Sequence, residues 1–188
     1  MLMKTEPLIA AIRAAKEGLQ KDERAGSVRV AYLSPQGRVI DQASIIELAS
    51  RECMVMLCGR YQGIDQRVID QEVDEEWSIG DFVLSGGELA AMTLIDAMTR
   101  FQSGAVGDKD SVNQDSFSNG LLHCPEYTKP QVFNSQHVPD VLLNGDHEAI
   151  RKWRLEQSLV VTKRKRPELI SKKKLNEEER NLLKHISE

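Results

Sequence analysis

The 188-residue sequence lacks the features that mark membrane, secreted and disulfide-rich proteins. No apolar run approaches the ~18 residues needed to cross a bilayer, and residues 1–13 do not have the charge, apolar core and cleavage site of a signal peptide. It has three cysteines, Cys53, Cys58 and Cys124, an odd number without metal-ligand spacing. We therefore expect reduced, structural thiols and a cytoplasmic protein.

Sequence signatures of common cofactor sites are also missing. The chain has neither G-x-G-x-x-G nor G-x-x-x-x-G-K-[ST], and it lacks the glycine-rich first turn of Rossmann-type methyltransferases. No His/Cys cluster has zinc-site spacing, and no nucleophilic triad is indicated. The histidines are scattered, and we expect surface positions for them: His123, His137, His147 and His185. We assign no metal site.

Charge is unevenly distributed. Residues 161–174 hold seven basic side chains and one acid, a net charge of +6 against −4 for the whole chain, which leaves −10 for the remainder. Such a run indicates either contact with a polyanion or a solvated, mobile tail. The basic residues are Lys163, Arg164, Lys165, Arg166, Lys172, Lys173 and Lys174.

The stretch from Asp74 to Leu89 is the most informative part of the chain. Phe82–Leu84 forms a short apolar run typical of a buried strand, and Gly86 and Gly87 permit close backbone approach. Glu88–Phe101 is apolar almost all round, which predicts a buried helix or a subunit interface. In α/β proteins, a strand that ends in glycines before a helix is a common ligand site.

The preceding residues alternate between helix and strand patterns. Helices are predicted at 6–21, 42–50 (with Asp41 as N-cap) and 64–69, and strands at 28–33 and 53–58. This alternation predicts an α/β fold with a mainly parallel sheet. Three turns, 34–37, 59–63 and 86–87, would follow strands and form one pocket, although each alone is more simply a tight turn.

The C-terminal half has a different pattern. Residues 102–140 contain little regular periodicity, and we expect 105–114 to be mobile. Residues 146–159 predict a helix in which Trp153 packs, and Ser171 or Asn176 would cap a last helix.

Several long motifs resemble the bacterial tRNA (guanine-N1)-methyltransferase family, TrmD. They occur in order at Tyr32–Gly37, Cys58–Tyr61, Asp74–Gly87, Trp153–Ser158 and Arg166–Leu169. The resemblance implies a SPOUT-type α/β domain with a C-terminal trefoil knot, a homodimer with the active site at the subunit interface, and S-adenosylmethionine as cofactor. It also implies methylation of N1 of the guanine 3′ of the tRNA anticodon; a Mg²⁺ requirement stays open.

The resemblance further assigns site residues. Asp115 matches the catalytic base, and Arg100 matches an arginine that contacts guanine. From the residues alone, Asp115 is a loop carboxylate no different from Asp108 or Asp110. Arg100 is then simply a cation at the C-terminus of a helix. The implied cofactor-binding residues are Tyr32, Leu33, Ser34, Pro35, Gly37, Gly59, Gln62, Ile79, Gly80, Asp81, Phe82, Val83, Leu84, Gly86 and Gly87.

The expected organisation is a knotted cofactor domain at 1–101, a partly mobile linker at 102–140 and a basic, helical tRNA-binding domain at 141–188. Gln62 and Phe82 depart from the family, which commonly has an acid and a tyrosine there. Met1 matches an interior family position, so we expect an exposed sheet edge and weakened catalysis. The alternatives are another SPOUT methyltransferase with a different RNA target, or an RNA-binding module without turnover.

Overall fold

The computed structural model describes residues 1–21, 26–105 and 114–186. The chain divides into two compact units, Met1–Gly107 and Asp108–Glu188, here called unit 1 and unit 2. Among the described residues, no helix is both long and apolar enough to cross a membrane. The predicted mobile segment 105–114 falls almost wholly outside the described residues. All three cysteines carry free thiols, as predicted.

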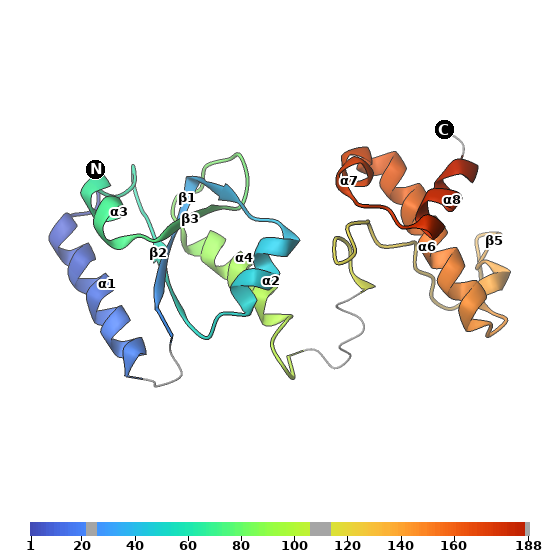
Figure 1. Ribbon diagram of the computed structural model, residues 1–188, viewed down its shortest axis with the longest axis horizontal. Helices are drawn as coiled ribbons and strands as arrows, with labels where there is room; N and C mark the ends of the chain where they lie inside the picture. Colours follow the sequence, from blue (N-terminus) through green and yellow to red (C-terminus); the bar gives the residue numbers. More distant parts are fainter. Residues whose placement is uncertain (22–25, 106–113, 187–188) are drawn as a thin grey trace. The chain divides into compact units, whose positions relative to one another are not determined.

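Unit 1 is built on a three-stranded parallel sheet (Figure 1). The central strand β1 (Arg29–Val39) pairs with β2 (Met54–Cys58) on one side and with β3 (Glu75–Ser78) on the other. Parallel neighbours need crossover connections, and helices between the strands supply them. The predicted α/β class with a parallel sheet is confirmed.

Alternating side chains of β1 divide between two apolar layers. Val30 and Tyr32 pack with α1 (Thr5–Gln20) and α3 (Gln66–Glu72), whereas Ala31 and Leu33 face α2 (Gln42–Ala49) and α4 (Glu88–Thr99). The first layer contains Leu8, Ile12, Leu57, Ile64 and Val68, and the second contains Ile45, Leu48, Trp77, Ala90, Ala91 and Leu94. The sheet is thus covered on both faces, which leaves the strand ends for a site.

The predicted turn at 34–37 does not end the first strand. β1 continues to Val39, with a shift of register between Leu33 and Arg38, so that Arg38 pairs with Trp77 of β3. Gly37 makes this continuation possible, because a Cβ atom there would lie 2.4 Å from the carbonyl carbon of Glu76. The Ser-Pro-Gln-Gly sequence therefore forms an irregularity within a strand.

The predicted buried strand at Phe82–Leu84 is wrong. The third strand is β3, which ends at Ser78, and residues 79–84 form an irregular segment. Val83 is 83% exposed and Phe82 is also exposed. Apolar side chains here lie on the surface beside a cavity, and the short run could not distinguish this from burial.

Burial of α4 on all sides is also wrong for this chain. Ala90, Ala91 and Leu94 enter the core, but Leu89, Met92 and Ile95 are exposed, Met92 by 64%. These three residues follow one another at a spacing of three, so they lie along one side of the helix. The helix is apolar on both its core side and its outer side.

Unit 2 is mainly helical. A hairpin of β4 (Val132–Phe133) and β5 (Gln136–His137) precedes the short helix η1 (Asp140–Leu142), α6 (His147–Lys165), α7 (Pro167–Lys172) and α8 (Glu177–His185). Asp146 caps α6, and Asn176 caps α8 in a reciprocal capping box with Glu179. Of the two predicted caps for the last helix, Asn176 is the one used.

Candidate functional site

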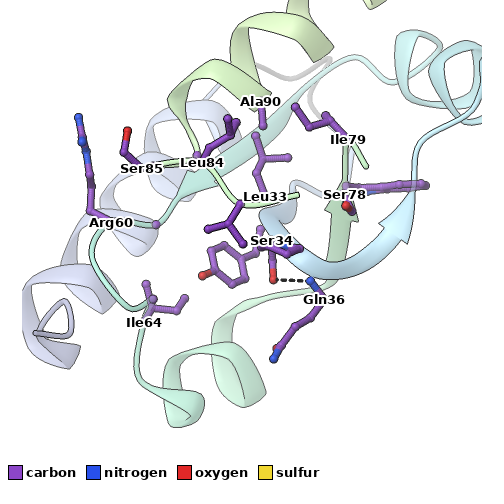
Figure 2. Close-up of a pocket in the computed structure, with 18 of the residues that line it drawn as sticks. Leu33, Ser34, Gln36, Arg60, Ile64, Ser78, Ile79, Leu84, Ser85 and Ala90 are labelled. Atoms are coloured by element: carbon purple, nitrogen blue, oxygen red, sulfur yellow. Dashed lines mark hydrogen bonds between the residues drawn. The ribbon is translucent and has the colours of Figure 1, made fainter. Parts of the chain in front are cut away.

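A cavity of about 630 Å³ opens in unit 1 where the strands give way to loops (Figure 2). Three segments contribute most of its lining: residues 32–36 of β1, the loop 59–64 after β2, and residues 77–87, which begin at the end of β3. This is the volume range of small-molecule sites, and parallel sheets place such sites beyond the carboxyl ends of their strands. The predicted convergence of three loops on one pocket is thus observed.

Every predicted cofactor-binding residue lines the cavity except Gly37 and Asp81, among the residues that the structure describes. Gly37 instead lies against the backbone of β3. Four further lining residues belong to the predicted turns without having been assigned individually: Gln36, Arg60, Tyr61 and Gly63. The lining residues outside those turns were not assigned: Ile64, Gln66, Ile69, Trp77, Ser78, Ser85 and Ala90. Most of the residues in these two groups are sequence neighbours of the assigned ones. The complete turns therefore predict the cavity lining better than the individually assigned residues do.

The loops after β2 and β3 are fastened to one another. The backbone N–H of Gly87 donates to the Gly59 carbonyl oxygen at 2.9 Å, and Arg60 forms a backbone bridge with Gly86. The Arg60 Nε also donates to Glu88 Oε1 at 3.0 Å. Hydrogen bonds from the backbone N–H of Glu88 and from Arg60 lower the pKa of the Glu88 carboxyl group. One wall of the cavity is therefore held by both chain segments.

Tyr32 forms part of the cavity wall next to Gly59. Burial raises the pKa of the Tyr32 hydroxyl, and the Glu76 carboxylate adds to the rise, so the phenol stays neutral and can donate a hydrogen bond. Ser34 Oγ accepts a hydrogen bond from the Gln36 N–H at 3.1 Å (Figure 2). Polar backbone and hydroxyl groups thus lie in the cavity wall alongside apolar side chains.

The same cavity wall also contains apolar side chains. Figure 2 shows Leu33, Ile79, Leu84 and Ala90 gathered around the cavity. A flat heteroaromatic ring would bury its faces against such side chains while its polar edge meets backbone groups. Among the described lining residues the one cationic side chain, Arg60, is paired with Glu88, so the wall suits a nucleoside such as adenosine better than a phosphate group.

Asp115 lies in a compact turn of unit 2 and is partly buried. Its carbonyl oxygen accepts from Ser118 N–H at 3.2 Å. His123 holds both neighbours of Asp115: its Nδ1 lies 2.6 Å from the Gln114 carbonyl oxygen, and its backbone N–H donates to Ser116 Oγ at 2.9 Å. The turn is therefore positioned through His123.

The same segment is anchored to α6. Leu122 N–H donates to the hydroxyl of Thr162 at 2.8 Å, and Thr162, which is fully buried, donates onward to the Ser158 carbonyl at 2.6 Å. Leu121 and Leu159 are buried beside this contact. Buried and hydrogen-bonded together, these groups fix the base of the Asp115 turn on a long helix.

The other predicted catalytic residue, Arg100, is the exposed C-cap residue of α4. It belongs to unit 1 and Asp115 to unit 2. Asp108 and Asp110, the carboxylates equivalent to Asp115 by residue type, lie outside the described residues.

The basic run is divided between structural and exposed side chains. Lys163 Nζ donates to the Ile186 carbonyl at 3.0 Å, Lys173 contacts Asn119 and Glu179, and Arg166 pairs with Glu168. Arg164, Lys165, Lys172 and Lys174 are exposed, as is Arg166, whose charge is paired. Only the first four present unshielded charge to a polyanion.

Sequence reasoning missed one group of potential ligands, His123, Cys124 and Glu126. One ligand atom of each lies within 4.8 Å of the others. The three residues occur in the contiguous sequence His-Cys-Pro-Glu, which differs from the separated ligand pairs of common zinc motifs.

Known proteins similar to this chain were found by comparison. The family model described as tRNA (Guanine-1)-methyltransferase TrmD matches residues 1–172. A tRNA (guanine-N(1)-)-methyltransferase of Mannheimia succiniciproducens is 55% identical over 188 residues, which are 100% of this chain and 72% of the relative. The corresponding protein of Pasteurella multocida is 55% identical over 99% of this chain and 74% of its own, and that of Vibrio vulnificus is 52% identical over 97% and 72%.

Proposed function

The chain belongs to the TrmD family of tRNA (guanine-1)-methyltransferases, and from this premise we propose that it methylates N1 of the guanine 3′ of the tRNA anticodon. The observation that carries the proposal is the cavity of about 630 Å³ at the three loops that hold the family motifs. Membership makes the chain an S-adenosylmethionine-dependent enzyme, and the cavity is where we propose that the cofactor binds.

The lining residues suit that cofactor. Leu33, Ile79 and Leu84 would cover the adenine faces, while the loop backbones would meet its polar edge. When bound, S-adenosylmethionine supplies a methyl group on a positively charged sulfur. Gln62, where relatives commonly carry an acid, and the neutral Tyr32 hydroxyl line the same cavity and offer neutral polar contacts.

The protein's catalytic contribution would be proton removal and charge stabilisation. Guanine N1 carries a proton at neutral pH and is a poor nucleophile until that proton leaves. We assign the proton to the Asp115 carboxylate as general base. The Arg100 guanidinium would donate to guanine O6 and stabilise the negative charge that develops there.

We further propose the family's trefoil knot and a homodimer with the active site at the subunit interface. The exposed side of α4, comprising Leu89, Met92 and Ile95, supports dimerisation, because large apolar residues that lie together on a helix favour a protein contact. Residues 1–101 would then be the cofactor domain, 102–140 the linker, and 141–188 the tRNA-binding domain of a cytoplasmic enzyme.

In this scheme, the exposed basic residues of unit 2 bind tRNA phosphates. Contacts of this kind release counterions, so tRNA affinity should fall steeply with salt. Arg164, Lys165, Lys172 and Lys174 are the candidates, since their side chains are exposed. Lys163 and Lys173 serve as internal controls because they contact the protein itself.

The test is to locate the transferred methyl group. The chain is incubated with methyl-labelled S-adenosylmethionine and a tRNA carrying guanine 3′ of the anticodon, with and without Mg²⁺. The proposal predicts N1-methylguanine at that position and none in a tRNA with adenine there. Label at another nucleotide would indicate a different RNA target, and cofactor binding without transfer would indicate a non-catalytic chain.

A further inference from the structure

We propose that His123, Cys124 and Glu126 form a binding site for a divalent transition metal ion of the zinc class, beside the Asp115 turn. The three side chains come from one short segment of unit 2 and contribute nitrogen, sulfur and oxygen donors. This inference does not depend on methyl transfer, because it concerns metal binding by residues outside the cofactor cavity.

The separations between the donor atoms are close to those of a small tetrahedral site, one being shorter and one longer. His123 Nε2 lies 2.8 Å from Glu126 Oε1 and 3.9 Å from Cys124 Sγ. Zinc binds nitrogen, oxygen and sulfur at about 2.0–2.3 Å, so tetrahedral donor atoms lie about 3.3–3.6 Å apart. The Glu126 side chain is 59% exposed, so it has room to rotate and lengthen its distance to His123.

The orientation of His123 is already fixed by a second hydrogen bond. Its Nδ1 lies 2.6 Å from the Gln114 carbonyl oxygen, which can only accept, so Nδ1 must carry a proton. Metal-binding histidines are commonly oriented by such a bond from the other ring nitrogen. Nε2 is left to face Cys124 and Glu126, which is the position of a coordinating nitrogen.

A positive charge is needed between Nε2 and the Glu126 carboxylate. Without one, two lone pairs would face each other at 2.8 Å. A proton can supply the charge, and the carboxylate accordingly raises the pKa of His123. A metal ion can take the place of that proton, since it would be bound by both groups.

Cys124 decides the kind of metal. Its side chain is 6% exposed, and burial raises the pKa of its thiol, with the nearby Glu126 adding to the rise. Arg154 opposes this by favouring the thiolate. A sulfur–nitrogen–oxygen set selects zinc, cobalt or similar ions over Mg²⁺, which prefers six oxygen ligands. Binding forms three metal–ligand bonds, displaces any proton held between His123 Nε2 and Glu126, and releases the proton of the Cys124 thiol.

Cobalt(II) gives a direct probe, because a thiolate ligand produces near-ultraviolet charge-transfer absorption and a tetrahedral site produces visible bands. The full chain, freed of metal with a chelator, is titrated with CoCl₂ and then with ZnCl₂. We expect one Co²⁺ per chain, thiolate absorption, and its loss when Zn²⁺ is added. Absence of thiolate absorption at millimolar Co²⁺ would overturn the proposal.

Variants separate this site from other thiols. Cys124→Ser should abolish the charge-transfer absorption, and His123→Gln or Glu126→Gln should weaken binding by about 10-fold or more. Cys53→Ser is the matched control and should bind as the unaltered chain does. An unchanged Cys124→Ser spectrum would refute the assignment. Glu126 is exposed, so Glu126→Gln tests the site even if substitution of buried Cys124 prevents folding.

Discussion

The hydroxyl oxygen of Tyr32 lies so close to Gly59 that a Cβ atom on Gly59 would be 2.8 Å from it. Tyr32 is buried and cannot move aside freely. This contact joins β1 to the loop after β2, and it explains why position 59 requires glycine although its backbone is not left-handed. The close approach brings both segments to one side of the cavity.

Gly59→Ala should therefore reshape the cofactor cavity. We expect a loss of about 1–3 kcal/mol in unfolding free energy from overpacking, and at least 10-fold weaker binding of S-adenosylmethionine by calorimetry. Gly18→Ala, in α1 with nothing within 4 Å, is the control and should stabilise slightly. If Tyr32→Phe added to Gly59→Ala restores neither property, the hydroxyl contact is not the cause.

Gln62→Glu tests whether residue 62 lies near the positively charged sulfur of bound S-adenosylmethionine. The added carboxylate should favour positively charged S-adenosylmethionine over its neutral demethylated product by about 1 kcal/mol, or about fivefold. Calorimetry with both ligands measures the ratio within one protein, so changes common to both cancel. Equal effects on the two affinities would place Gln62 away from the sulfonium.

Asp41 gives a stability prediction with a definite pH dependence. The Ser44 hydroxyl and then the Ser44 backbone N–H lower the pKa of this N-cap below 3.8. Its ionised form therefore stabilises the fold above about pH 4, and this contribution is lost as the pH falls through the lowered pKa. Asp41→Asn keeps the cap but not the titration.

Urea unfolding of both proteins between pH 2.5 and 7 checks this. The native chain should be the more stable one at pH 7, and the difference should shrink as the solution is acidified. A difference that stays constant across the range would show that the Asp41 charge does not contribute.

The exposed side of α4 predicts a change in oligomeric state. Met92→Asp would bury a carboxylate in the proposed dimer interface, which is strongly unfavourable, so light scattering should show monomers at concentrations where the native chain is dimeric. Ala14→Asp on the exposed side of α1 is the control and should remain dimeric. A native chain that is monomeric, or a dimeric Met92→Asp variant, would contradict this interface.

Features of the fold were predictable from the sequence where the interactions that determine them join residues close in the chain. Asp41 and Asn176 were predictable as caps because each bonds to a backbone group three residues away. The continuation of β1 past Gly37 was not, because it depends on β3 some forty residues later. The Ser-Pro-Gln-Gly sequence suits both a turn that ends the strand and an irregularity within it. Only the pairing with β3 selects the second.

The candidate site divides in the same way. The glycine-bearing turns predicted the cavity, since strand ends in a parallel sheet meet at one edge. Asp115 and Arg100 came from family resemblance alone, because a loop carboxylate and a helix-terminal arginine have no distinguishing local pattern. The exposed Phe82 and Val83 were misassigned because an apolar run also suits a cavity rim.

The role of Asp115 is the central claim, and single-turnover methyl transfer measures it most directly. With saturating tRNA and cofactor, Asp115→Asn should transfer methyl groups about 10²–10⁴-fold more slowly while binding S-adenosylmethionine as tightly as the native chain. Asp140→Asn, an exposed acid of the same unit, should react normally. An Asp115→Asn variant that reacts at the native rate would contradict the assignment of the general base.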